Sequence, residues 1–186
     1  FRNGAKNPNA FRRKEISVDD IMASPVLNYP LRQFMFCAPD EGAAAVIMCR
    51  ADLAHKYTDK PVYVRASEIR TRTFGAYEVH ATSAPRDADV SPTVDAAKAA
   101  YEAAGIGPED VSVAEVYDLS TALELDWYEH LGLCAKGDAE HLLRSGATTI
   151  GGRVPVNPSG GLASFGEAIP AQAIAQVCEL NWQLKG

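Results

Sequence analysis

The 186-residue sequence lacks an excess of basic residues, a long apolar run and paired-cysteine motifs. Its 18 Lys and Arg face 24 Asp and Glu, and the net charge of −6 argues against a nucleic-acid partner. The apolar segments fall well short of the roughly 18 residues that span a bilayer. The absence of CxxC spacing predicts a cytoplasmic protein with reduced core thiols and no bound metal, and a zinc site or a disulfide is the alternative. The four cysteines are Cys37, Cys49, Cys134 and Cys178.

What the sequence does contain is typical of one globular α/β protein, with 47% hydrophobic and 23% charged residues. A helix is predicted from Ser91 to Gly105, since a capping serine, a first-turn proline and a terminal glycine agree. Strand-like segments alternate with such helices, which favours an α/β fold. We expect strands at 43–51, 61–72 and 111–117, a loop at 81–90, and further helices at 17–24, 120–131, 136–146 and 171–184.

A glycine-rich stretch, NPSGGLASFGEA at 157–168, is the strongest local motif. Gly160, Gly161 and Gly166 permit backbone angles that other residues resist, so the loop can press closely against a ligand. The loop also leads into the last predicted helix, whose first amides suit an anion or oxyanion. By itself the motif is a weak signal, because glycine loops at helix starts are often only tight turns.

Three segments together resemble a known family. NPSGGLASFGEAIPA is similar to the NPSGG-L-S-x-GHP-x-GA stretch of the thiolase superfamily, in its sterol-carrier or lipid-transfer-protein branch. VAEVYDLSTALELDWYEHLGLC resembles the AEVHDCF segment of that branch and the helix ending in GLC. NPNAFRRK…S…PLR…DEGAAAVIM resembles its NP-A…S…PL…DGAAA segment. The segments occur in the family's order along nearly the whole chain.

The resemblance implies a layered αβαβα thiolase fold and a piece of a longer polypeptide. The chain also opens without an initiator Met. Residues 1–36 are expected to end a loop domain, and 37–60 to hold the last strand of the first thiolase half and a linker. Residues 61–186 are expected to form the second half, incomplete at its C-terminus. The nucleophilic cysteine of true thiolases would lie upstream of residue 1.

Two departures from the family pattern predict an altered chemistry. Tyr117 stands where the branch has the histidine of HDCF, and Glu167 where the family has the histidine of GHP. In thiolases these histidines stabilise a thioester enolate and activate the cysteine. The substitutions resemble thiolase-like aldolases of actinobacterial steroid side-chain degradation. Those enzymes cleave a β-hydroxyacyl-CoA and work with a small acyl-CoA-binding partner built of a zinc ribbon and an OB-fold.

Retro-aldol cleavage needs a base near the β-hydroxyl and donors near the thioester oxygen. Tyr117 is expected to serve either as that base, in its phenolate form, or as a phenol that protonates the enolate or holds its oxygen. The alternative is a core tyrosine whose hydroxyl makes only a structural hydrogen bond. Glu167 either passes a proton on or is a solvated carboxylate at a helix start. Asp118 is expected to be a supporting, structural or capping group. The expected substrate-binding loop residues are Asn157, Ser159, Gly160, Gly161 and Gly166.

The resemblance thus predicts a CoA-thioester carbon–carbon lyase that acts on a steroid side chain. CoA is part of the substrate, and no cofactor is expected to be bound in this chain. One alternative is an acyltransferase of the lipid-transfer branch that uses a cysteine outside this chain. The other is a non-catalytic subunit that binds acyl-CoA or sterol. The expected assembly is a homodimer, joined by the small partner as a heterotetramer.

Overall fold

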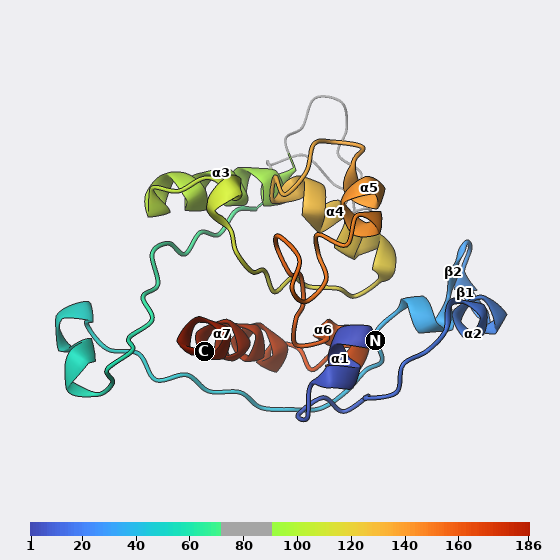
Figure 1. Cartoon of the computed structure of the whole chain (residues 1–186), viewed down its shortest axis with the longest axis horizontal. Helices are drawn as coiled ribbons and strands as arrows, with labels where there is room; N and C mark the ends of the chain where they lie inside the picture. The colour runs from blue at the N-terminus through green and yellow to red at the C-terminus, as the bar shows by residue number, and fades with distance from the viewer. Residues whose placement is uncertain (72–90) are drawn as a thin grey trace.

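The computed structural model describes residues 1–71 and 91–186, so the loop predicted at 81–90 lies outside the described residues. Figure 1 shows α3, α4 and α5 grouped on one side and α1, α6 and α7 on the other. The elements are α1 (Arg2–Lys6), α2 (Val18–Ala23), β1 (Val26–Asn28), β2 (Leu31–Arg32), α3 (Pro92–Ala104), α4 (Thr121–His130), α5 (Ala139–Arg144), α6 (Gly161–Phe165) and α7 (Ala171–Lys185). Short 3₁₀ turns are η1 (Gln33–Met35), η2 (Ala51–Lys56) and η3 (Pro108–Asp110).

The helix predictions are confirmed to within a residue or two for α2, α3, α4 and α7, and α5 lies inside its predicted segment. Helix α3 ends at Gly105, which has a φ of 70°, and its amide donates to the carbonyls of Tyr101 and Glu102. Helix α4 begins after Ser120, whose hydroxyl accepts a hydrogen bond from the amide of Leu123 at 3.2 Å. Local capping chemistry therefore determines where these helices start and stop.

The strand predictions at 43–51, 61–72 and 111–117 are wrong as regular strands within the described residues. The structure pairs β1 with β2 in a two-stranded antiparallel sheet and otherwise forms isolated bridges, one of which joins Ala114 to Val156. A strand needs a hydrogen-bonded neighbour along its length. The 43–51 segment, which was expected to be a strand, is open to solvent: Ile47 is fully exposed and Met48 is 71% exposed.

The hydrophobic core lies between the 111–116 segment, the chain around residue 155, and helices α4 and α5. Tyr128 from α4 is 1% exposed and Val154 is fully buried at its centre. This core supports the 113–118 segment from one side and leaves its polar side chains free to contact the glycine-rich loop. The buried core residues are Ala114, Val116, Tyr128, Leu133, Ala139, Val154 and Val156. Among the described helices, none combines the length and apolar character needed to cross a bilayer.

Candidate functional site

The 113–118 segment and the start of the glycine-rich loop run side by side in the same direction. The amide of Ala114 donates to the carbonyl of Pro155 at 3.0 Å, and the amide of Asn157 donates to the carbonyl of Ala114 at 2.8 Å. The Asn157 side chain continues this pairing, since its Oδ1 accepts from the amide of Val116 at 2.7 Å. Asn157 itself has a φ of 48°, which turns the chain into the loop.

Two glycines of the loop are required by packing within the protein. Gly160 has a φ of 106°, and a β-carbon there would lie 2.5 Å from the Cα of Gly4 in α1. Gly161 has a φ of 59°, and a β-carbon there would collide with the carboxylate of Asp118. The loop therefore contacts α1 and the 113–118 segment at the positions where side chains are absent.

Two carboxylates of the 113–118 segment hold the loop, Asp118 being buried and Glu115 half-buried. The amide and hydroxyl of Ser159 donate to Glu115 at 3.1 and 2.9 Å. The amide of Leu162 donates to Asp118 at 2.8 Å, so Asp118 contacts the first turn of α6. Burial raises the pKa of each carboxyl to about 7, while the hydrogen bonds from the loop oppose that rise. Sequence reasoning missed Glu115, although a carboxylate inside the apolar run VAEVY is a usable signal.

Tyr117 and Asp118 contact different parts of the glycine-rich stretch, since Asp118 contacts Leu162 and Tyr117 contacts Glu167. The Tyr117 hydroxyl donates a hydrogen bond to Oε1 of Glu167, and both side chains are half-buried. Its carbonyl oxygen accepts from Nε1 of Trp127 in α4 at 2.7 Å, which fixes the end of the segment. Tyr117 and Glu167, singled out by two motifs 50 positions apart, are thus in direct contact.

Cys37 joins this pair, and sequence reasoning treated it only as a core thiol. Its Sγ donates to Oε2 of Glu167 at 3.7 Å, and its amide donates to the carbonyl of Leu119 at 3.0 Å. The amide of Glu167 in turn donates to the carbonyl of Ala38 at 2.8 Å. Burial, followed by the charge of Glu167, raises the pKa of Cys37 to about 11. The sulfur is therefore a protonated thiol at neutral pH, a state that is a weak nucleophile.

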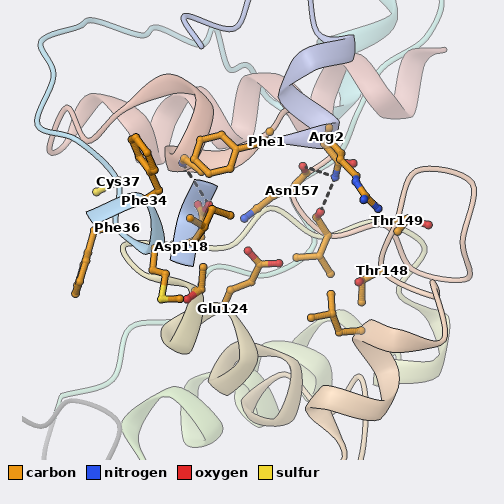
Figure 2. A pocket seen from close by; sticks show the side chains of 18 of the residues that line it. Phe1, Arg2, Phe34, Phe36, Cys37, Asp118, Glu124, Thr148, Thr149 and Asn157 are labelled. Atoms are coloured by element: carbon orange, nitrogen blue, oxygen red, sulfur yellow. Dashed lines mark hydrogen bonds between the residues drawn. The ribbon is translucent and has the colours of Figure 1, made fainter. Parts of the chain in front are cut away.

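The predicted loop residues are divided between two pockets. Asn157 and Gly160 line a pocket of about 280 Å³, whose side chains are drawn in Figure 2. Ser159, Gly161 and Gly166 line a second pocket of about 360 Å³ beside α7. Tyr117 and Glu167 line neither of these two pockets. In the described ranges no group of three or more His, Cys, Asp or Glu side chains is arranged to hold a metal ion.

Comparison with known proteins places this geometry in a family. The family described as "Thiolase C-terminal domain-like" matches residues 75–186. An acetyl-CoA acetyltransferase of Methanothermobacter thermautotrophicus is 39% identical over 99% of this chain and 47% of its own length. The benzoylsuccinyl-CoA thiolase subunit BbsB of Thauera aromatica is 38% identical over 99% of this chain and 46% of its own length. Sterol carrier protein 2 of Oryctolagus cuniculus is 36% identical over 100% of this chain and 34% of its own length.

A solved structure supports the same placement. It is named "Ltp2-ChsH2(DUF35) aldolase", and it superposes with a TM-score of 0.75 at 25% identity, over 95% of this chain and 46% of that chain. Together with the family match, it confirms the predicted thiolase-like α/β fold. The chain spans about half the length, or less, of the relatives and of the structure that it matches.

Proposed function

Because the chain belongs to the thiolase superfamily, in its sterol-carrier or lipid-transfer branch, we propose that the complete protein is a lyase. It cleaves a β-hydroxyacyl-CoA by a retro-aldol step into a ketone and a shorter acyl-CoA. The observation that carries this proposal is the hydrogen bond from Tyr117 to Glu167. A phenol paired with a carboxylate can move a proton, whereas the thiolase resemblance calls for histidines at these two positions. The aldolase name of the superposed structure agrees with this chemistry.

The proposed proton path uses both residues. The Tyr117 phenol accepts the proton of the substrate β-hydroxyl while it passes its own proton to Glu167. The Cα–Cβ bond then breaks, its electrons form the thioester enolate, and the oxygen becomes the ketone carbonyl. Tyr117 returns a proton to the enolate carbon and recovers its own from Glu167, so both residues end as they began. Cys37 stabilises the charged form of Glu167 by its thiol hydrogen bond and does not attack the substrate.

The substrate and assembly follow from the same resemblance. We propose a steroid side-chain acyl-CoA as substrate, with CoA supplied as part of that substrate. We also propose a homodimer that binds a small zinc-ribbon and OB-fold protein which carries the acyl-CoA. Support for a second component comes from the superposed structure, whose name joins Ltp2 to ChsH2(DUF35).

The second candidate function is acyl transfer between CoA thioesters. It is favoured by the names of two relatives, an acetyl-CoA acetyltransferase and a thiolase subunit. It requires a nucleophilic thiolate, and the high pKa of Cys37 speaks against that residue in this role. The nucleophile would therefore come from a cysteine outside this chain. A non-catalytic acyl-CoA- or sterol-binding subunit is the third alternative, supported by likeness to sterol carrier protein 2.

One pair of incubations separates these functions. The complete protein is given a β-hydroxyacyl-CoA, and separately a β-ketoacyl-CoA with free CoA, and the products are identified by mass. A ketone and a shortened acyl-CoA from the first incubation support the lyase. Two acyl-CoA products from the second, with none from the first, identify a thiolase and reject the proposal. Binding without turnover in either incubation identifies a carrier subunit.

A further inference from the structure

Helix α7 exposes apolar side chains along most of its length. The helix has 15 residues, and none of them is buried. Val177 is 44% exposed and Trp182 is 58% exposed, and both belong to a series of apolar residues that runs from Ile174 to Leu184. A helix in water owes most of its stability to the packing of an apolar face. The apolar face of α7 therefore requires a cover that residues 1–71 and 91–186 do not supply.

The extended segment 42–49 lies beside α7 and has backbone groups without backbone partners. The carbonyl of Ala45 accepts from Sγ of Cys178 in α7 at 3.6 Å. Within the described ranges, no amide or carbonyl of 42–49 takes part in a backbone–backbone hydrogen bond. Figure 1 shows the chain between η1 and η2 as a long extended trace. An extended segment with unpaired amides and carbonyls is a template for the addition of another strand.

The 360 Å³ pocket between this segment and α7 contains two buried amide atoms that also lack partners. They are Oε1 of Gln172, an acceptor, and Nε2 of Gln176, a donor, and neither has a hydrogen-bond partner among the described residues. The two glutamines are four positions apart on α7, so they lie on the same face of the helix. Burying an amide atom without a partner is costly, and a peptide backbone offers the complementary N–H and C=O groups.

The charge and the walls of this pocket restrict what can occupy it. Its charged lining residues are Glu115 and Glu179, and no Lys, Arg or His is among the residues that line it. Two carboxylates disfavour an occupant with phosphate or carboxylate groups. Leu162, Phe165 and Trp182 add apolar walls. The pocket therefore suits an uncharged or basic polypeptide segment with apolar side chains.

We infer that this pocket and the 42–49 segment bind an extended segment of the same polypeptide that lies outside residues 1–186. The bound segment pairs with the backbone of 42–49, donates an N–H to Gln172 and offers a carbonyl to Gln176. The lengths of the relatives support an occupant from the same polypeptide, because the matched part is 47% and 46% of two of them and more than half of each lies outside it. A covalently attached segment is also always present, whereas a separate partner would leave α7 uncovered until it bound.

Hydrogen exchange of the complete, purified protein, measured by mass spectrometry of peptides that cover 42–49, tests the pairing. We expect these amides to exchange about 10²-fold or more slowly than unprotected amides. The protection should persist after dilution of about 100-fold, because the occupant is attached. Exchange at the unprotected rate overturns the inference. Protection that is lost on dilution identifies a second copy, and protection that needs an added protein identifies a separate partner; either result also overturns it.

The variant Gln176→Leu gives an opposite sign for the two cases. If Nε2 has a partner in the bound segment, the variant leaves that carbonyl unpaired and should lower the thermal midpoint of the complete protein by about 2 °C or more. If Nε2 stays unpaired, the leucine removes a buried orphan donor, and a raised midpoint overturns the inference. Gln183→Leu is the matched control on the same helix, because Gln183 is exposed and bonds only to Glu179 at 2.7 Å among the described residues. Neither measurement depends on turnover, so this inference and the proposed lyase function can fail separately.

Discussion

Tyr117→Phe removes the hydroxyl that donates to Glu167 and leaves the aromatic ring in place. The backbone at this position should not move, since the Tyr117 carbonyl is held by Nε1 of Trp127 at 2.7 Å. If the hydroxyl only makes a structural hydrogen bond to Glu167, its loss lowers the free energy of unfolding by about 1 kcal/mol and hardly changes the turnover rate. If it transfers the proton, turnover falls by about 10²–10⁴-fold, or roughly 3–5 kcal/mol of barrier. We expect the second result.

The assay measures kcat/KM for cleavage of the β-hydroxyacyl-CoA together with the thermal midpoint of each variant. Glu167→Gln is the companion variant, because the amide oxygen still accepts from Tyr117 but the side chain no longer takes up a proton. If the two residues act as one proton path, the double variant should be about as slow as either single variant. The reasoning is refuted if Tyr117→Phe stays within a few-fold of wild-type turnover while its midpoint falls.

Three further predictions concern the loop, pH and assembly. Gly161→Ala should lose turnover and stability because its β-carbon meets Asp118. The control Gly105→Ala has a φ of 70° and open space around the new β-carbon, so it should cost only about 1–2 kcal/mol of stability and keep turnover. Equal losses of activity in the two variants would contradict this prediction. The pKa of Asp118 is raised to about 7 in the folded protein, so this group's contribution to stability is lost as pH rises through that value. The thermal midpoint should therefore fall less between about pH 5 and about pH 8 in Asp118→Asn than in wild type. If the midpoint falls equally with pH in both proteins, Asp118 is not the group responsible. Light scattering of the complete protein should give a homodimer, and a stable, active monomer would reject the proposed assembly.

The helices could be predicted because their signals are local. Ser120 caps α4 through a contact three residues away, and Gly105 ends α3 with a backbone angle that glycine permits. The strands could not be predicted correctly, because an apolar run indicates only that its side chains can be buried. Pairing also requires a neighbour, and the exposed Ile47 lies in a segment that forms no regular strand in the described residues.

Some features of the candidate site follow from the local sequence, whereas others depend on the tertiary fold. Successive side chains of an extended segment point to opposite sides, and accordingly Asp118 contacts Leu162 while Tyr117 contacts Glu167. The approach of Cys37 was beyond sequence reasoning, because it depends on the backbone pairing of 37–40 with Leu119 and Glu167.

This arrangement links the glycine-rich stretch to the Tyr117–Glu167 pair through one short segment of chain. Glu115 and Asp118 hold Ser159 and the first turn of α6 from the same short segment that presents Tyr117 to Glu167. A change at Ser159 or Gly161 is therefore expected to shift the backbone that positions the phenol, whose hydroxyl contacts Glu167 at the far end of the glycine-rich stretch. Since a misplacement of about 1 Å is enough to slow a positioned reaction about 10²-fold, the proposed function predicts that Glu115 and Asp118 affect turnover through the position of Tyr117.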